Sequence, residues 1–365
     1  MYQVMEFVVA GAPASELQEW LVAGIRAEMV RQGHHEVDAD APSPQLVLNL
    51  VDPERPRPFR RRAQGTFVVG LAEAWGDPED VLRTAYPLMV RSLGNLFMYV
   101  ARTDGRFRTF FITLERGYYE ISHQEGDDAG YFATVYQRLA PLATSQLVIN
   151  NRFDPDLPPE LWDGTEATRQ ITWASRELDR LDLLPAPFPM DEFLSERELR
   201  HIKQLYGVGG LSYCNVSARH DERRFWMSAS GVNKSDLRII GQHILLVKDY
   251  EPETNAIVLS VPPGVEPHRV SVDAIEHWMI YTEHPQVGAV LHLHAWLPEA
   301  VSTDVNYPCG TRQLAQSVAE LVRLAPDPGR AVIGLRNHGL TVTGPSLEEI
   351  FHRIEGRVLR QVPMS

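Results

Sequence analysis

The 365-residue sequence contains few lysines and few cysteines. Lys203, Lys234 and Lys248 are its lysines, and arginine supplies the rest of its fixed positive charge. An enzyme that forms a Schiff base needs a desolvated lysine at its centre, so this chemistry has few candidates here. Cys214 and Cys309 cannot build a disulfide framework and lack the pairing of a cysteine-based zinc site, which agrees with a reducing compartment.

The sequence also lacks an excess of positive charge and long apolar runs. A formal net charge of -13 argues against nonspecific binding to nucleic acid or anionic membranes, because both require a positive surface. No apolar run reaches the roughly 18 to 20 residues that cross a bilayer, and the N-terminus shows no secretory pattern. We therefore expect a cytoplasmic protein with no nucleic-acid or membrane partner.

Length and hydrophobic periodicity predict two α/β domains. In the first part of the chain the predicted elements are strands at 2–10, 45–51 and 66–73, helices at 14–33 and 78–100, and a strand pair at 107–121. Residues 153–189 are rich in Pro, Asp and Leu, which is typical of a connection between domains. We place the boundary near residue 190, with a separate N-terminal α/β domain at 1–190 and a second domain at 191–365.

The role of the N-terminal domain is not legible in its sequence. The basic run from Arg60 to Arg62 could bind an anion, but a charge run this short is usually a solvated turn.

In the second domain the order of elements is again α/β. The predicted helices lie at 195–206, 271–283 and 311–324 and after the capping box Ser346–Glu349, and the predicted strands at 224–228, 238–248, 255–261, 288–296 and 331–335.

Three histidines in the second domain point to metal binding. His292 and His294 alternate in one predicted strand, so both imidazoles lie on the same face. Alone, such a pair is more often two partly buried histidines in ordinary hydrogen bonds. His338, however, follows another predicted strand in an Asn-His-Gly turn, from which it can reach a neighbouring strand. Three imidazoles with an open fourth position are the usual catalytic zinc arrangement, so we predict a site for Zn²⁺ or another divalent metal.

Six ordered motifs extend this observation over residues 195–365. They are CNVSAR (214–219), SASGVNKSDL (228–237), SVDAIEHWMIY (271–281), HPQVGAVLHLHAW (284–296), YPCGTRQLA (307–315) and LRNHGLTVTG (335–344). Together they resemble the class II aldolase/adducin family, which implies an α/β/α layered fold for this domain. In that family the HxH strand and the NHG turn bind a divalent metal, usually zinc, which implies this role for His292, His294 and His338.

The resemblance also implies a site for the anionic group of a substrate. The asparagine of the family's GN(I/V)S motif corresponds to Asn215, the TG or SG turn to Ser230 and Gly231, and the serine before the next helix to Ser271. A glycine turn, a hydroxyl and a helix N-terminus suit a phosphate or carboxylate without fixed positive charge. The alternative is that these residues only close turns and that Ser271 only caps its helix.

Asp273 is the expected proton-transferring residue. Aldolases of the family usually have glutamate here, whereas the sugar-phosphate 4-epimerases have aspartate, in a pattern similar to that of Ser271, Asp273, His277 and Tyr281. The shorter side chain would act as a metal ligand or as an acid/base close to the metal. Alternatively, Asp273 is a first-turn carboxylate that only favours the helix dipole. We expect His277 to be a packing histidine or a support for the site.

Two departures from the family pattern leave the reaction open. Cys214 replaces the usual glycine before Asn215, and the segment between His294 and Tyr307 is shorter than in the family. Asp304 and Tyr307 lie in or beside this segment and are candidate replacement proton donors.

The resulting hypothesis is a metal-dependent lyase or epimerase, with dehydratase and decarboxylase not excluded. It would act on a sugar phosphate or hydroxy acid through a zinc-stabilised enediolate. The resemblance further implies a homo-oligomer, in relatives a tetramer. The rival hypothesis is a non-catalytic, adducin-like binding or scaffold protein, and a third is that the N-terminal domain is the active part.

Overall fold

The structure is a computed structural model that describes residues 4–63, 65–74, 80–103, 106–183, 192, 194–205 and 214–365. The chain forms two compact units. Unit 1 comprises Met1–Ser145, Met190–Ile202 and Met364–Ser365, and unit 2 comprises Gln146–Pro189 and Lys203–Pro363. Helix α5 (Glu196–Leu205) contributes residues to both. None of the helices in the described part of the chain is long and apolar enough to cross a membrane.

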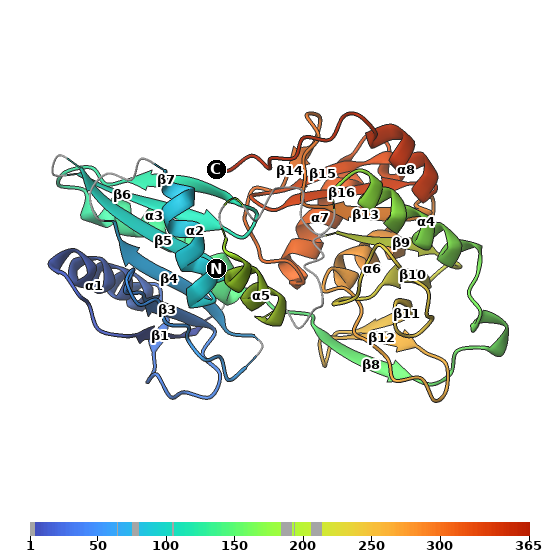
Figure 1. Cartoon of the computed structure of the whole chain (residues 1–365), viewed down its shortest axis with the longest axis horizontal. Coiled ribbons are helices and arrows are strands. Elements are labelled where there is room, and N and C mark those ends of the chain that lie inside the picture. Colours follow the sequence, from blue (N-terminus) through green and yellow to red (C-terminus); the bar gives the residue numbers. More distant parts are fainter. Residues whose placement is uncertain are drawn as a thin grey trace. The chain divides into compact units, whose positions relative to one another are not determined.

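Unit 1 is built on a seven-stranded sheet with the order β2-β1-β3-β4-β5-β6-β7. The first five strands in this order are parallel, and β6 and β7 extend the sheet as antiparallel strands. The bounds are β1 (Glu6–Ala10), β2 (His35–Glu36), β3 (Leu46–Leu50), β4 (Phe67–Glu73), β5 (Leu96–Thr103), β6 (Arg106–Thr113), β7 (Gly117–Ser122), α1 (Glu16–Arg31), α2 (Val81–Ser92) and α3 (Asp128–Thr144). Helices α1 and α3 pack against each other, while α2 packs on β5 and β6 (Figure 1).

The helix predicted over 78–100 is wrong in its second half. Helix α2 ends at Ser92 because Leu93 adopts a left-handed conformation, with φ of 59°, and Gly94 bonds back to Met89. The chain then runs as strand β5 from Leu96, beside β4. The helix predicted over 14–33 is confirmed as α1, which the Ser15 side chain caps.

Unit 2 is built on a nine-stranded sheet with the order β14-β15-β16-β13-β9-β10-β11-β12-β8. Its strands are β8 (Asn150–Asp154), β9 (Asn215–Arg219), β10 (Phe225–Ser228), β11 (Ile244–Glu251), β12 (Ala256–Ser260), β13 (Ala289–Leu293), β14 (Val301–Ser302), β15 (Val332–Leu335) and β16 (Gly339–Gly344). Its helices are α4 (Glu166–Arg180), α6 (Ala274–Glu283), α7 (Arg312–Leu324) and α8 (Leu347–Ile354), with short 3₁₀ turns at Pro159–Leu161 and Pro328–Arg330. The strand predicted from residue 238 begins only at Ile244.

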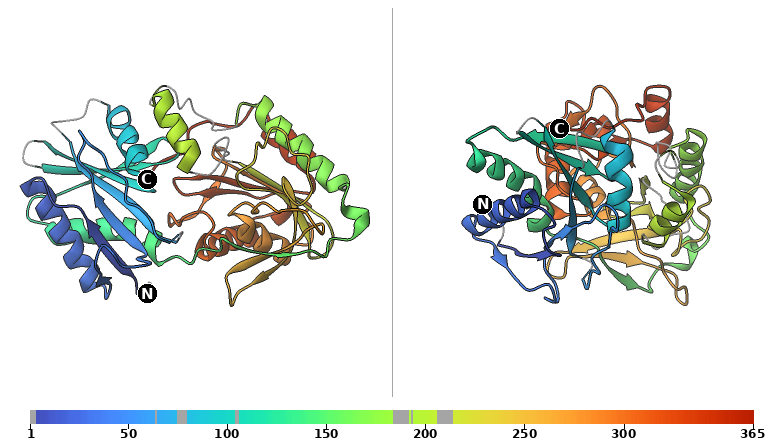
Figure 2. Two further views of the ribbon diagram at one scale, coloured as in Figure 1. Left: turned by 60° about the horizontal axis from the view of Figure 1, so that its bottom comes forward. Right: turned by 60° about the vertical axis from the view of Figure 1, so that its left-hand side comes forward.

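The helices of unit 2 form two pairs. Helices α4 and α8 pack against each other, as do α6 and α7, and the sheet lies between the pairs (Figures 1 and 2). This is the α/β/α layering that the sequence predicts for the C-terminal domain. The core of the unit is continuous and includes large buried aromatic side chains such as Phe225, Trp226 and Tyr281.

The units do not separate at the boundary predicted near residue 190. Strand β8 runs parallel to β12, from the Asn150–Ala256 pair to the Asp154–Ser260 pair, and therefore completes the second sheet. Helix α4 packs on β9 and β10. The segment 153–189, interpreted as a connection between domains, thus contains the end of β8 and the whole of α4, both of which belong to unit 2.

Candidate metal centre

The structure brings together the three histidines that the sequence singles out. His292 lies in β13, His294 directly follows that strand, and His338 lies in the turn between β15 and β16. One ring nitrogen of each can be chosen so that all three atoms lie within 4.8 Å of one another. Their ring centroids are 4.3 to 5.1 Å apart. Within the described residues, no second group of three or more histidine, cysteine or acidic side chains is close enough to hold a metal ion.

The turn that carries His338 depends on its two neighbours. Asn337 has a φ of 59°, in the left-handed region that asparagine tolerates better than most residues. A Cβ atom on Gly339 would lie only 2.1 Å from the carbonyl oxygen of Leu293. The Asn-His-Gly sequence therefore allows β16 to start directly against the end of β13, where His294 lies.

The environment of the histidines suits a cation bound by neutral imidazoles. The side chain of His292 is 1% exposed, and neither of its ring nitrogens has a hydrogen-bond partner. Burial, together with the neighbouring His338, lowers the pKa of His292 and of His294 well below the usual range. Neutral imidazole is the form that binds zinc and similar ions. The three side chains therefore form a donor set that fits a divalent metal.

His292 is the middle residue of a polar row that crosses three strands. It lies directly opposite Asn215 of β9 on one side and Thr341 of β16 on the other. Directly paired residues of neighbouring strands project from the same face of a sheet. Helix α6 covers this face, because the Ser217 hydroxyl, two residues after Asn215, contacts His277 of α6.

Asp273 lies at one end of this row. The Asn215 amide donates a 2.7 Å hydrogen bond to its Oδ2 atom, while its Oδ1 atom is buried and has no hydrogen-bond partner. Asp273 is the N-cap residue of α6, but its side chain makes no capping hydrogen bond. The prediction that Ser271 is the N-cap is therefore wrong, since the helix starts two residues later. The Asp273 carboxylate faces the polar row rather than the helix backbone.

A second carboxyl group, Glu276, lies at the other end of the row. The Thr341 hydroxyl donates a hydrogen bond to its Oε1 atom, and its Oε2 atom is buried without a partner. Burial and then the negative charge of Asp273 raise the pKa of Glu276 to about 8. The sequence analysis did not single out this residue. Its spacing of three from Asp273 was the available signal, since residues at i and i+3 share a helix face.

Lys234 is a second residue that the sequence analysis did not assign to the site. Its side chain is 5% exposed, and its ammonium donates a hydrogen bond to the backbone carbonyl of Cys214. Burial lowers the pKa of Lys234 to about 8, although Cys214 and the charge of Asp273 favour its protonated form. Burial also raises the pKa of the Cys214 thiol to about 11, which disfavours a nucleophilic thiolate.

His277 contacts strand β9 through its own side chain. Its Nδ1 atom lies 2.7 Å from the Ser217 hydroxyl, which also lies 2.9 Å from the hydroxyl of Tyr281. Burial lowers the pKa of His277 to about 3, so the ring is neutral. These contacts place His277 in the packing between α6 and β9.

Three of the four residues predicted to bind an anion, Ser230, Gly231 and Ser271, lie in two adjoining segments. The Ser230 amide donates a 2.8 Å bond to the Arg269 carbonyl, and Ala229 and Val270 form an isolated β-bridge. Ser230 and Gly231 are exposed, and Gly231 has a φ of 79°, whereas Ser271 is buried. Asn215, by contrast, is bonded to Asp273. Of the candidate replacement donors, Asp304 is exposed and Tyr307 is half-buried.

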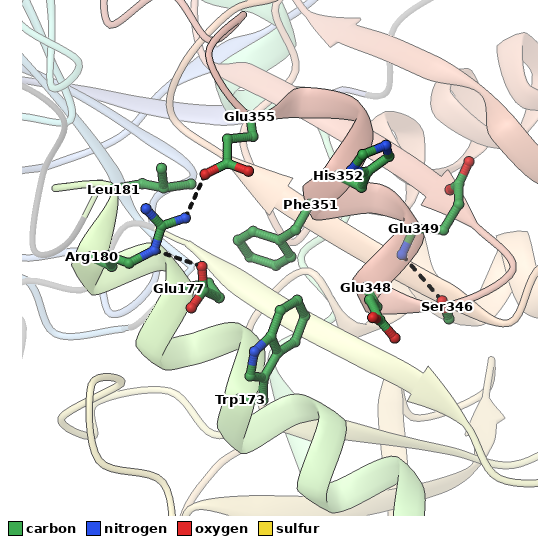
Figure 3. A pocket seen from close by; sticks show the side chains of 10 residues that line it. All are labelled: Trp173, Glu177, Arg180, Leu181, Ser346, Glu348, Glu349, Phe351, His352 and Glu355. Carbon is green, nitrogen blue, oxygen red and sulfur yellow. Dashed lines mark hydrogen bonds and ion pairs between the residues drawn. The ribbon is translucent and has the colours of Figure 1, made fainter.

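Unit 2 also has a surface groove of about 430 Å³ between α4 and α8, lined by none of the residues above. Arg180 lies between Glu177 and Glu355 and makes ion pairs of 2.8 and 2.7 Å (Figure 3). The rings of Trp173 and Phe351 meet edge to face, with centroids 5.3 Å apart (Figure 3). These contacts join α4 to α8, so the groove is explained by helix packing.

Comparison with known proteins assigns the C-terminal part of the chain to a family. Residues 199–303 and 296–357 match the family model of the class II Aldolase and Adducin N-terminal domain. Together with the α/β/α layering and the three histidines, this match shows that the C-terminal region carries a class II aldolase/adducin domain.

Individual relatives are distant from this chain. A methylthioribulose-1-phosphate dehydratase of Leptospira biflexa serovar Patoc is 25% identical over 139 residues, which is 37% of this chain and 62% of the relative. The chain thus spans less than two thirds of the length of this curated relative. Among solved structures, an L-fuculose 1-phosphate aldolase is 14% identical, with a TM-score of 0.35, over 55% of this chain and 92% of the other. YgbL of Escherichia coli is 17% identical, with a TM-score of 0.31, over 53% and 92%.

Proposed function

We propose that unit 2 is a metal-dependent lyase that acts on a small, anionic hydroxy-carbonyl compound, such as a sugar phosphate or a hydroxy acid. The observation that carries the proposal is the buried His292, whose two ring nitrogens have no hydrogen-bond partner. Leaving such a group unsatisfied costs roughly 1 to 3 kcal/mol, which metal coordination would offset. With His294 and His338, it offers the donor set of a catalytic zinc site.

The chemistry needs both the metal and a proton-transferring side chain. A bound Zn²⁺ or similar ion would polarise a substrate carbonyl and stabilise the negative charge that develops beside it. Asp273 would take a proton from the substrate through its Oδ1 atom, while the Asn215 amide holds the other oxygen in place. The dehydratase among the relatives favours elimination of water, and C–C cleavage and epimerisation begin with the same kind of proton removal.

The far end of the substrate would be an anion. Ser230, Gly231 and Ser271 are proposed to bind its phosphate or carboxylate, because their segments adjoin each other through the Ser230–Arg269 hydrogen bond. A homo-oligomer that assembles through unit 2 is a further part of the proposal.

A non-catalytic binding role is the second candidate. It is favoured by the matched family model, which covers adducins as well as aldolases. The two candidates differ in what they require of the histidines, because a binding module needs no cation at His292.

Metal analysis distinguishes the two candidates. Protein purified without chelator or metal-affinity tag should contain about one zinc or similar ion per chain by plasma mass spectrometry. His292→Ala should lose it, whereas His352→Ala, a control at an exposed position of α8, should retain it. Wild-type protein that takes up no metal even after reconstitution would end the enzyme proposal and make the binding role the leading one. Metal-loaded protein should then be screened for elimination of water, C–C cleavage and epimerisation on sugar phosphates and hydroxy acids.

A further inference from the structure

Helix α6 turns a polar, fully buried side chain toward the sheet one turn after Asp273. The Nδ1 atom of His277 lies 2.7 Å from the Ser217 hydroxyl of β9. The same hydroxyl lies 2.9 Å from the hydroxyl of Tyr281, so the three side chains form a hydrogen-bonded triad. The direction of the two hydrogen bonds decides which nitrogen of His277 carries the proton.

The direction follows from the Tyr281 end of the triad. Burial raises the pKa of Tyr281, so the phenol keeps its proton and needs an acceptor for it. The side chain is 2% exposed and packs between the Phe225 ring and the Arg219 guanidinium, which offer no acceptor. Among the described residues, Ser217 is the acceptor that its hydroxyl contacts. Ser217 therefore accepts from Tyr281 and donates its own proton to Nδ1 of His277.

The proton of the His277 ring is consequently on Nε2. Burial lowers the pKa of this ring to about 3, so the ring is neutral and has a single N–H group. Nε2 is buried and has no hydrogen-bond partner within the part of the chain that the structure describes. A buried N–H without an acceptor costs free energy, so this donor calls for a partner close to it.

The N–H group faces the polar row of the site. Helical side chains lean toward the N-terminus of their helix, so the His277 ring leans away from Tyr281 and toward Asp273. Asn215, the partner of Asp273, precedes Ser217 by two residues and shares its face of β9. Asp273 is also among the groups that act electrostatically on the His277 ring, which agrees with this placement.

Asp273 offers the acceptor that this donor lacks. Its Oδ2 atom is held by the Asn215 amide, whereas its Oδ1 atom is buried without a partner. Asp273 and His277 are four residues apart in sequence, a spacing at which side chains on a helix can meet. A hydrogen bond from Nε2 to Oδ1 would satisfy both atoms and fix the carboxyl group at each of its oxygens.

We propose that His277 is a positioning residue of this site and donates its Nε2 proton to Oδ1 of Asp273. The inference rests on the proposed function, in which Asp273 transfers the proton. Oδ1 has a second lone pair, so the hydrogen bond leaves room for a proton from the substrate. The triad sets the direction of the donor, and His277 changes neither its charge nor its covalent bonds.

Nitrogen-15 NMR of the full-length, zinc-loaded chain, labelled at histidine, tests the position of the proton. The signals of His277 are those that disappear in His277→Gln. We expect a proton on Nε2 and none on Nδ1. A proton on Nδ1 in the wild type would overturn the inference, because the triad would then run in the opposite direction.

The same spectra identify the acceptor. Asp273→Ala removes it, so the Nε2 proton of His277 should move upfield as its hydrogen bond is lost. The matched control is Glu276→Gln, which changes the other carboxyl group of the same turn and should leave this proton close to its wild-type position. An unchanged Nε2 proton in Asp273→Ala would show that His277 does not hold Asp273.

Turnover separates positioning from packing. Glutamine at position 277 keeps an N–H donor of similar reach, whereas leucine fills a similar volume without one. On a sugar phosphate or hydroxy acid that the wild type converts, His277→Leu should lower kcat by about 10²-fold with little change in KM, and His277→Gln should recover most of the loss. Equal kcat values in the two variants would contradict the positioning role. If the wild type converts none of the compounds, the proposed function has failed, and the NMR spectra still decide whether His277 holds Asp273.

Discussion

At the scale of single residues, Lys234 is a buried cation beside the proposed metal centre. Its ammonium donates a hydrogen bond to the Cys214 carbonyl and interacts electrostatically with the charge of Asp273. Burying an ammonium is costly unless it is well compensated, and here the folded chain releases its proton more easily than the unfolded chain does. The stability of the protein must therefore depend on pH in a range set by this lysine.

Stability should rise with pH between about 8 and 10.5. The pKa of Lys234 is about 8 in the folded chain, below its ordinary 10.5, so in this range the unfolded chain binds a proton that the folded chain does not. Excess proton binding by the unfolded state makes the unfolding free energy increase with pH. Relative to Lys234→Met, the wild type should gain about 2 to 3 kcal/mol across this range in urea unfolding.

Lys248→Met serves as the control for this prediction. Burial lowers the pKa of Lys248, but its ion pairs with Asp154 and Asp156 outweigh this effect, so the pKa is raised overall. A group whose pKa is raised in the folded chain stabilises the fold at pH values below its unfolded-state pKa. This stabilisation is lost only when the pH rises above that pKa. Lys248→Met should therefore leave the rise between pH 8 and 10.5 intact. Equal slopes for wild type and Lys234→Met would show that Lys234 does not titrate in this range.

The residues of the site differ in how well they could be predicted from the sequence around them. His292, His294 and His338 are recognisable because the strand period and the Asn-His-Gly turn constrain where their side chains point. Glu276 and Lys234 give no comparable signal. A single glutamate in an amphipathic helix, or a lysine in a polar turn, is normally solvated, and its burial depends on strands that are distant in sequence.

At the scale of elements, the proposed metal centre depends on how closely the start of β16 approaches the end of β13. Gly339→Ala should push these strands apart, because the new Cβ would meet the Leu293 carbonyl oxygen at 2.1 Å and the Cα of His294 at 3.1 Å. His338 would then move away from His294. We expect zinc affinity to fall by at least about 10-fold, measured by competition with a chelating dye, and stability to fall by about 1 to 3 kcal/mol.

Gly264→Ala separates this steric effect from the ordinary cost of replacing a glycine. Gly264 has a φ of 78° and no heavy atom within 4 Å of the position of a Cβ. Alanine there should cost about 1 kcal/mol of backbone strain and leave zinc affinity unchanged. If Gly339→Ala binds zinc as tightly as Gly264→Ala does, the close approach of β16 is not what positions His338.

Helices with a clear apolar period and the usual capping residues could be predicted. Helices whose ends lack the usual capping residue were given wrong bounds. Helix α7 lies within a residue of its predicted start and is capped by Thr311. Helix α2 was predicted too long because its left-handed end is a leucine, where glycine is the usual signal. Helix α6 was predicted to start at Ser271 because serine is a favoured N-cap, whereas packing over the polar row starts it after Asp273.

At the scale of the whole molecule, the segment 146–183 belongs structurally to unit 2. Strand β8 pairs with β12, and α4 packs on β9, β10 and α8. The segment also supplies the buried core side chains Val148, Leu157, Ile171 and Leu178. Composition suggested a connection over residues 153–189 because prolines and aspartates dominate that stretch, while its few apolar residues find their partners only in the folded sheet.

Two fragments test this assignment. Residues 146–365 keep β8 and α4, whereas residues 191–365 lack both and leave the opposing core exposed. Burial of a large apolar side chain contributes about 1.5 to 3 kcal/mol, so four of them contribute about 6 to 12 kcal/mol, comparable with the stability of a whole domain. We therefore expect 146–365 to melt cooperatively by circular dichroism and to bind zinc, and 191–365 to do neither. Both fragments contain residues 191–202 of unit 1, and the longer fragment also contains residue 190. This segment therefore does not distinguish the two fragments. Cooperative melting of 191–365 with one bound zinc would restore the boundary near residue 190.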